Sequence, residues 1–145
     1  MFNVQCSMLN KMIPRGIRNN NPLNIRLGNT WLGERTINTD GSFEQFVTTE
    51  FGLRAGFKLL ERYIRRYGRN TVRKIITAWA PSNENNTSAY IAQVVKVSGL
   101  GADEVIAYDN YYQMSRLVDA MISVECGTHI PPETIKGGWR LYGGY

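Results

Sequence analysis

The stretch MSRLVDAMISVECG, from Met114 to Gly127, decides how this chain is organised. Apolar residues recur in it at helical spacing and form one stripe, which comprises Met114, Leu117, Val118, Met121 and Ile122. Gly127 can supply a C-terminal cap, so the helix is predicted to end there. Glu125 falls on the same stripe, four residues after Met121. The pattern therefore places a carboxyl group on the apolar face of a helix, close to its C-terminus.

A carboxyl group on an apolar face is expensive to ionise. A carboxylic acid that keeps its proton near neutral pH is suited to act as a general acid. The alternative is that the stripe turns slightly and that Glu125 lies at its rim, in water or paired with an arginine. The pattern alone leaves both interpretations open.

The length of 145 residues suffices for one domain with a hydrophobic core. We predict an N-terminal extension over residues 1–13 and one continuous domain over residues 14–145. No apolar run approaches the length of a membrane span, and the N-terminal residues lack the apolar core of a signal peptide. We therefore expect synthesis in the cytoplasm without export by the usual secretory route.

The net charge of +5 favours polyanionic partners or surfaces. Much of the positive charge falls on one predicted helix, at Arg54, Lys58, Arg62, Arg65, Arg66 and Arg69. Aromatic residues do not interleave with these cations as a single-strand stacking platform requires, and no zinc-finger or RNP-like pattern occurs. The simpler interpretation is a solvated helix face, and a nucleic-acid partner is not supported.

The two cysteines, Cys6 and Cys126, stand far apart in the chain and give no metal-ligand spacing. The single histidine, His129, has no recognisable serine or cysteine nucleophile beside it. We therefore expect no metal and no cofactor. If the chain is an enzyme, its working groups are carboxylates.

The predicted architecture is mainly α, within the α+β class, with about five helices and one small β-hairpin. The Asn- and Gly-rich segment from Arg15 to Gly33 predicts a structured loop, because Asn side chains bond nearby backbone groups and tolerate left-handed conformations. Short strands at residues 37–38 and 43–47, joined by an Asp-Gly turn, predict the hairpin.

Helix signals divide the rest of the chain. N-cap residues are expected at Thr48 or Thr49, at Thr71, and at Asn86 or Thr87. The fourth helix is expected from about Asn110 to Cys126, and a last short helix can start at Pro132. The first helix is predicted to bury a stripe of Leu53, Phe57, Leu60, Ile64 and Tyr67.

Three segments together resemble a known family. They are RGIRNNNPLNIR from Arg15, followed by Trp31-Leu-Gly; WAPSNENNTSAYI from Trp79; and AMISVECG from Ala120. Their order and spacing are similar to a phage-associated family of lysozyme-like, peptidoglycan-directed domains, whose members are often labelled phage structural protein. The resemblance covers nearly everything from Pro14 to about Gly138. It implies a lysozyme-like fold and peptidoglycan as the substrate.

A looser resemblance links the chain to wall glucosaminidases, in which a helix ending in Glu-Ser-Gly precedes an Asn-Asn loop and a Trp-x-Gly turn. Here Glu125-Cys-Gly resembles that helix end, displaced to the C-terminus. We therefore hypothesise a circularly permuted arrangement. It would bring Glu125 next to Asn21, Asn24 and Trp31.

Cleavage of a glycosidic bond needs a protonated acid at the leaving oxygen and a second group that supports the oxocarbenium-like transition state. Glu125 is the predicted general acid, and Glu34, after the Trp-x-Gly turn, is the best second carboxylate. Glu84 lies in the family's WAPxxEN motif and is a third candidate. Glu34 could instead be an exposed turn residue, and Glu84 a residue before a helix cap.

Sugars offer apolar ring faces and many hydroxyls, so aromatic and amide side chains are expected to bind them. The candidates for substrate binding are Asn21, Asn24, Trp31, Glu50, Asn85 and Tyr90. Glu50 could instead be a helix-start charge, and Trp79 is expected in the core.

We therefore predict cleavage of the peptidoglycan glycan strand, of lysozyme, glucosaminidase or lytic transglycosylase type. Peptidoglycan and other phage virion proteins are the expected partners, with action at the cell wall. The alternatives are a non-catalytic virion or wall-binding protein and a basic nucleic-acid-associated protein.

Overall fold

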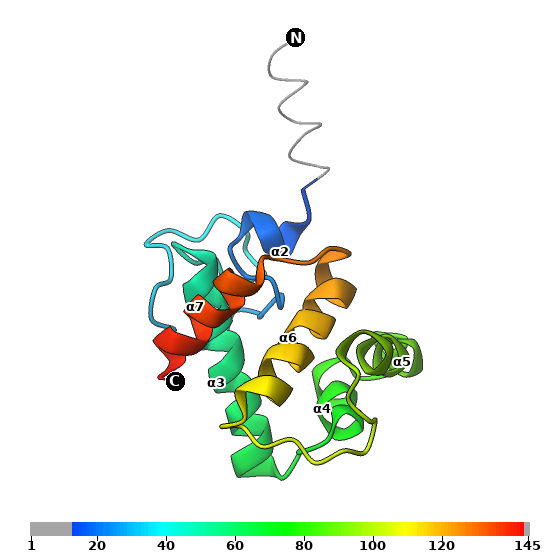
Figure 1. The fold of residues 1–145 in the computed structure, drawn as a ribbon. Helices are drawn as coiled ribbons and strands as arrows, with labels where there is room; N and C mark the ends of the chain where they lie inside the picture. The colour runs from blue at the N-terminus through cyan, green and yellow to red at the C-terminus, as the bar shows by residue number, and fades with distance from the viewer. Residues whose placement is uncertain (1–12, 144–145) are drawn as a thin grey trace.

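A computed structural model describes residues 13–143, which form six helices (Figure 1). They are α2 (Arg15–Arg18), α3 (Thr49–Tyr67), α4 (Val72–Trp79), α5 (Thr87–Ser98), α6 (Tyr111–Cys126) and α7 (Pro132–Tyr142). The described chain is mainly helical, as predicted. The five predicted helices are α3 to α7, and the short α2 lies inside the segment predicted as a structured loop.

Side-chain caps fix where the helices begin. The Thr48 hydroxyl accepts a hydrogen bond from the amide of Phe51 at 3.3 Å, and Thr71, Asn86 and Asn110 cap α4, α5 and α6 in the same way. The ends are fixed by glycines in the left-handed region, such as Gly127 after α6 (φ 66°). Of the two N-cap candidates predicted for each helix, Thr48 caps α3 and Asn86 caps α5.

Helix α6 lies at the centre of the molecule and packs against α2, α3, α5 and α7 (Figure 1). All five residues of its predicted stripe are completely buried: Met114, Leu117, Val118, Met121 and Ile122. Helix α3 packs on α7, and α4 packs on α5. The two helix pairs are thus joined through α6, whose apolar face supplies much of the core.

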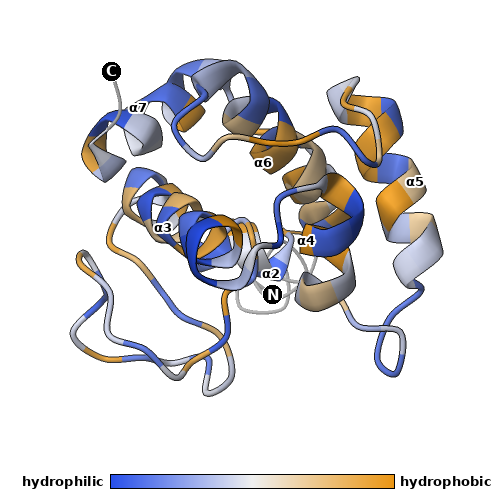
Figure 2. Ribbon diagram, turned by 90° about the horizontal axis from the view of Figure 1, so that it is seen from below, coloured by the Kyte–Doolittle hydropathy of each residue, from blue (hydrophilic) through white to orange (hydrophobic). Residues whose placement is uncertain are grey.

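The stripe predicted for α3 is confirmed at Leu53, Phe57 and Leu60, which are completely buried. It is wrong for Tyr67, which is 52% exposed at the last position of the helix. Ile64, one turn earlier, is partly buried and packs against the core, so only the last position of the stripe lies outside it. In Figure 2 hydrophilic and hydrophobic positions alternate along α3, as expected for a helix with one solvent-facing side.

Helix α7 approaches α3 closely because Gly138 has no side chain. A Cβ atom at this position would lie 2.4 Å from the Cβ of Leu53. The next residue, Trp139, packs edge-on against Phe57, with ring centroids 5.1 Å apart. The Gly-rich C-terminal segment is therefore a packed helix up to Tyr142.

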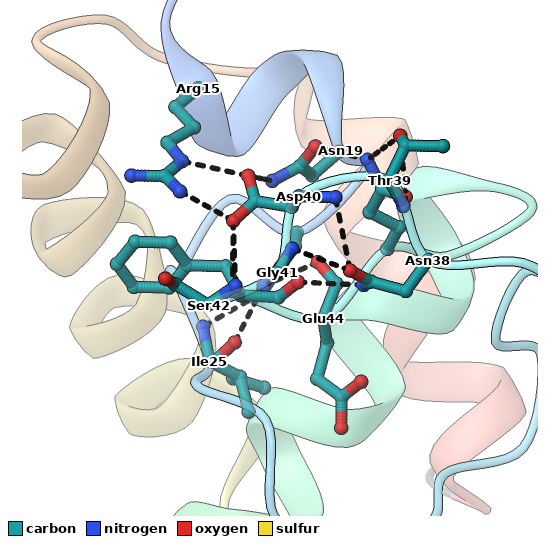
Figure 3. Close-up of polar contacts among 12 residues, drawn as sticks. Arg15, Asn19, Ile25, Asn38, Thr39, Asp40, Gly41, Ser42 and Glu44 are labelled. Carbon is teal, nitrogen blue, oxygen red and sulfur yellow. Dashed lines mark hydrogen bonds and ion pairs between the residues drawn. The ribbon is translucent and has the colours of Figure 1, made fainter.

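The predicted hairpin does not form in the described part of the chain. Ile37 is 74% exposed and belongs to no strand, whereas isolated antiparallel bridges join Arg26 to Phe43 and Glu34 to Phe46. The turn itself is present, but side chains hold it. The Asn38 amide oxygen accepts from the Gly41 amide at 2.8 Å, and Asp40 accepts from the Phe43 amide at 3.0 Å (Figure 3).

Two predictions concern residues that the structure does not describe. The extension over residues 1–13 lies, apart from Ile13, outside the described range, and so does Cys6. Within residues 13–143, no helix has both the length and the apolar character needed to cross a bilayer.

Candidate functional site

The loop between α2 and Ile25 is built by asparagines in an unusual backbone conformation. Asn20 and Asn24 both have φ of 52°, in the left-handed region that Asn tolerates better than other side-chain-bearing residues. Gly16 lets α6 approach this loop, because a Cβ there would lie 2.7 Å from the Asn24 side-chain oxygen and 3.0 Å from the Cys126 sulfur. The loop is therefore fitted closely against the C-terminal end of α6.

Glu125 lies at this junction and its two carboxylate oxygens have different partners. The Asn24 side-chain amide donates to Oε1 at 2.9 Å, and the Tyr90 hydroxyl donates to Oε2 at 2.8 Å. Both donors are neutral, and no ion pair of Glu125 is present among the described residues. The carboxyl group is half-buried. It is therefore oriented by two side chains from other elements without being neutralised.

The surroundings of Glu125 are poorly hydrated. Tyr90 is 6% exposed, and burial together with the charge of Glu125 raises the pKa of its hydroxyl far above the ordinary value. Burial and the same charge raise the pKa of Cys126 to about 11. Tyr90 thus stays protonated and keeps donating to Glu125, and Cys126 stays a neutral thiol that donates to the carbonyl of Pro22 at 3.3 Å.

A groove of about 280 Å³ begins at Asn24. Its lining consists of Asn24, Ile25, Arg26, Leu27, Asn29, Leu59, Tyr63 and Trp79. Tyr63 and Trp79 are half-buried and meet edge to face, with ring centroids 5.8 Å apart. Asn24 therefore links the carboxylate of Glu125 to a groove that offers aromatic rings, amides and a guanidinium group. Such a mixture suits a ligand with apolar faces and many hydroxyls.

The permuted arrangement predicted contact between Glu125 and the loop, and the structure brings Glu125 and Asn24 together. Asn21, three residues before Asn24, is completely buried. Its side-chain amide forms hydrogen bonds with the backbone of Ile25 and Glu44. Trp31 is also buried, and its backbone amide donates to Glu34 at 2.8 Å. Sugar contacts by Asn21 and Trp31 stay predictions.

Glu34 has a carboxyl neighbour that the sequence analysis missed. Glu44 is 4% exposed, and its Oε2 atom has no hydrogen-bond partner among the described residues. Burial and the charge of Glu34 raise the pKa of Glu44 to about 7. Glu34 thus belongs to a second carboxyl pair, and no described contact joins it to Glu125. The antiparallel bridge between Glu34 and Phe46 brings the two carboxyl groups near each other, and their sequence spacing alone does not predict this.

The other predicted site residues lie apart from Glu125. Glu84 and Asn85 are exposed in the segment between α4 and α5, where the Asn85 amide donates to the carbonyl of Pro81 at 3.3 Å. Glu50 is half-buried in the first turn of α3 and faces α7, since a Cβ on Gly137 would lie 3.0 Å from its Cγ. Their roles stay predictions.

Asp40 is the best-satisfied carboxylate that the structure describes, and the sequence analysis assigned it only to a turn. It accepts from the Arg15 guanidinium, from the Asn19 amide at 2.9 Å, and from the backbone amides of Ser42 and Phe43 (Figure 3). These donors hold the pKa of Asp40 well below its ordinary range. Its position and partners indicate that it stabilises the loop.

Two aromatic residues of the groove were not predicted as site residues. Trp79 was predicted in the core, and it does pack against the core, half-buried, while it also lines the groove. Tyr63 was not singled out. Their positions one helical turn from buried residues do not distinguish a core aromatic from a groove aromatic. Within the described residues, no three His, Cys, Asp or Glu side chains gather as a metal site would require.

No model of a known protein family matches this chain. The chain is 38% identical over 136 residues to Protein P5 of Pseudoalteromonas phage PM2, and the alignment covers 89% of this chain and 83% of the phage protein. The chain belongs to the same family of phage proteins. This kinship confirms the predicted phage association in its coarser form, and the wall-directed activity is taken up below as a proposal.

Proposed function

We propose that this chain cleaves the glycan strand of bacterial peptidoglycan, with Glu125 as the general acid. The observation that carries the proposal is the pair of neutral donors, Asn24 and Tyr90, that orient a half-buried carboxyl group at the edge of an aromatic groove. In this proposal the carboxyl group delivers its proton to the leaving oxygen of a strand that lies in the groove. The lysozyme-like character of the domain is part of the same proposal.

The aromatic rings of Tyr63 and Trp79 supply the sugar-binding surface in this proposal. Pyranose rings present apolar faces that pack on aromatic side chains, and their hydroxyls suit the amides of Asn24 and Asn29. A glycan strand in the groove would reach Glu125 beside Asn24. Peptidoglycan is then the substrate that accounts for the groove, for the carboxylate and for the motifs of the sequence.

The surroundings of Glu125 favour transglycosylation over hydrolysis. Among the described residues, no other carboxylate contacts Glu125, Asn24 or Tyr90. With a single carboxyl group, Glu125 first donates its proton to the leaving oxygen. As a carboxylate it then takes the proton from a hydroxyl of the same sugar, whose oxygen bonds to the anomeric carbon and closes an anhydro ring. Hydrolysis would need Glu34 or another group to serve as the second carboxylate.

Digestion of purified peptidoglycan tests the proposal. The wild-type chain, Glu125→Gln and the control Glu133→Gln, an exposed residue of α7, are compared, and released fragments are identified by mass. We expect anhydro-muropeptides from the wild type and the control but none from Glu125→Gln. Reducing-end muropeptides would instead indicate hydrolysis. No release by the wild type from any wall type would overturn the proposal.

Kinship to a phage protein favours a second candidate function, a non-catalytic protein of the virion that binds the cell wall. Such a protein could act at the wall as a component of the particle and in contact with other virion proteins. In that case Glu125→Gln would bind peptidoglycan and assemble into particles as the wild type does, and neither would release fragments.

A further inference from the structure

The outward side of α3 carries a row of cations that the proposed chemistry does not use. We use the name α3 cation row for four residues of the helix and for Arg69, which lies just beyond its C-cap; the four are Lys58, Arg62, Arg65 and Arg66. The four cations of the helix itself span eight positions, from Lys58 to Arg66, which is about 12 Å along the helix axis. The described ion pairs give it one carboxylate partner, Glu61, which lies 3.5 Å from Arg65. Glu61 also accepts a hydrogen bond from Tyr142.

Aromatic rings hold these cations in place. Lys58 lies over Tyr142 at 5.9 Å, Arg62 over Trp31 at 5.9 Å and Arg65 over Tyr108 at 5.0 Å. Arg66 and Arg69 both lie over Tyr67, and Arg69 also lies over Tyr63 at 5.5 Å.

An aromatic ring orients a cation without neutralising it. The N–H donors of the row therefore stay available, and less conformational freedom is lost when an anion binds them. An ordinary solvated helix face carries both signs of charge at i, i+4 spacing. In the described chain the α3 cation row has one such pair, Glu61 with Arg65, for five cations, and this excess of positive charge favours an anionic partner.

The row borders the groove that begins at Asn24. Leu59 and Tyr63 of the same helix line that groove, and each follows a cation of the row directly in sequence. Tyr63 both lines the groove and lies beneath Arg69. Side groups that project from a polymer bound in the groove would therefore lie close to the cations of the row.

We infer that the α3 cation row binds the carboxylates of the short peptides that project from a peptidoglycan strand. The inference rests on the proposed function, in which the glycan occupies the groove. It makes peptide-bearing strands the preferred substrate over bare glycan. Nucleic acid fits the row less well, because cations already lie over the rings of Trp31 and Tyr108, which stacked bases would need.

The test measures binding separately from cleavage. Chains carrying Glu125→Gln are incubated with purified sacculi and with the same sacculi stripped of peptides by an amidase, over a range of salt concentrations. The double variant Arg62→Gln/Arg66→Gln removes two exposed cations of the row. The matched control, Arg116→Gln/Arg140→Gln, removes the same charge from α6 and α7. Thermal unfolding of each variant confirms that it is folded.

We expect intact sacculi to bind about tenfold more tightly than stripped sacculi at low salt, because charge-assisted contacts are lost with the peptides. The Arg62/Arg66 variant should lose this preference, and the Arg116/Arg140 control should keep it within about twofold. Equal binding to both sacculi, or a preference that survives in the Arg62/Arg66 variant, would overturn the inference.

Competition with duplex DNA separates the two anionic partners. If DNA displaces sacculi at low concentration, and the Arg62/Arg66 variant abolishes DNA binding, the row is a nucleic-acid surface and the inference fails. Cleavage without a peptide preference would contradict only the inference. A peptide preference without any cleavage by the wild type would contradict only the proposed enzyme.

Discussion

Asp40 and Glu125 both accept hydrogen bonds from asparagines of the loop that follows α2, but their other partners differ in kind. Asp40 accepts from a guanidinium, a side-chain amide and two backbone amides. Glu125 accepts from one amide and one phenol, both neutral. A cation and backbone amides lower the pKa of Asp40 and fix it as a carboxylate, whereas no cation contacts Glu125 among the described residues. The difference separates a residue that stabilises the loop from the residue that we propose as the general acid.

The largest expected effect follows from removing the acid itself. Glu125→Gln should lower the rate of fragment release by at least about 100-fold, because the amide cannot donate the proton that general acid catalysis needs. Its free energy of unfolding should change by less than about 1 kcal/mol, since both neighbours can still bond a glutamine. Muropeptide release and urea unfolding measure the two quantities. A large loss of stability would make Glu125 resemble Asp40.

Asp40→Ala should show the reverse pattern. It removes five hydrogen bonds and leaves the buried amide of Asn19 short of a partner, so the free energy of unfolding should fall by about 2–3 kcal/mol. The rate of fragment release per folded molecule should stay within about twofold of wild type. The partners of Asp40 keep its pKa low, so its contribution is present above about pH 4 and is lost as the pH falls below that. The difference in the free energy of unfolding between the wild type and Asp40→Ala should therefore shrink as the pH is lowered from 6 to 2. A constant difference would contradict the comparison.

Glu44 is a third carboxyl group with which Asp40 and Glu125 can be compared. It is buried, has no cation as a partner among the described residues, and does not contact Glu125. Its pKa of about 7 in the folded chain exceeds its value of about 4.5 in the unfolded chain. The folded state therefore binds the extra proton between these values, and stability falls as the pH rises from about 4.5 to 7. Glu44→Gln should remove this dependence and raise the free energy of unfolding at pH 8 by about 1–2 kcal/mol. Fragment release should persist, which would show that burial of a carboxyl group alone does not make a site.

Tyr90→Phe should give the smallest effect. It deletes one of the two donors to Glu125, and one such hydrogen bond is worth about 1–1.5 kcal/mol. We expect fragment release to slow by about 5- to 20-fold, with little change in binding to sacculi. Tyr112→Phe, on an exposed residue of α6, serves as the control and should be neutral. An equal rate in both variants would mean that Tyr90 does not position the carboxyl group.

Local physical chemistry made much of the helical fold readable from the sequence. The apolar stripe from Met114 to Ile122, the caps at Thr71 and Asn110 and the glycine at 127 each act within one or two helical turns. Such short-range patterns are written directly in the residue order. The hairpin was predicted wrongly because the turn at residues 39–42 satisfies its amides with side chains, and an Asp-Gly pair alone does not reveal that choice.

The residue order by itself therefore determined the main helices and the presence of a carboxyl group on the apolar stripe of α6. Only the tertiary structure decided what that carboxyl group meets. Asn24 and Tyr90 lie 101 and 35 positions from Glu125 in the chain, and Gly16 allows the loop to come close enough for contact. The pairing of Glu34 with Glu44 and the stacking of the α3 cations on distant rings arose in the same way. Periodicity reports which face of a helix is buried, but packing between distant segments sets which side chains share that space.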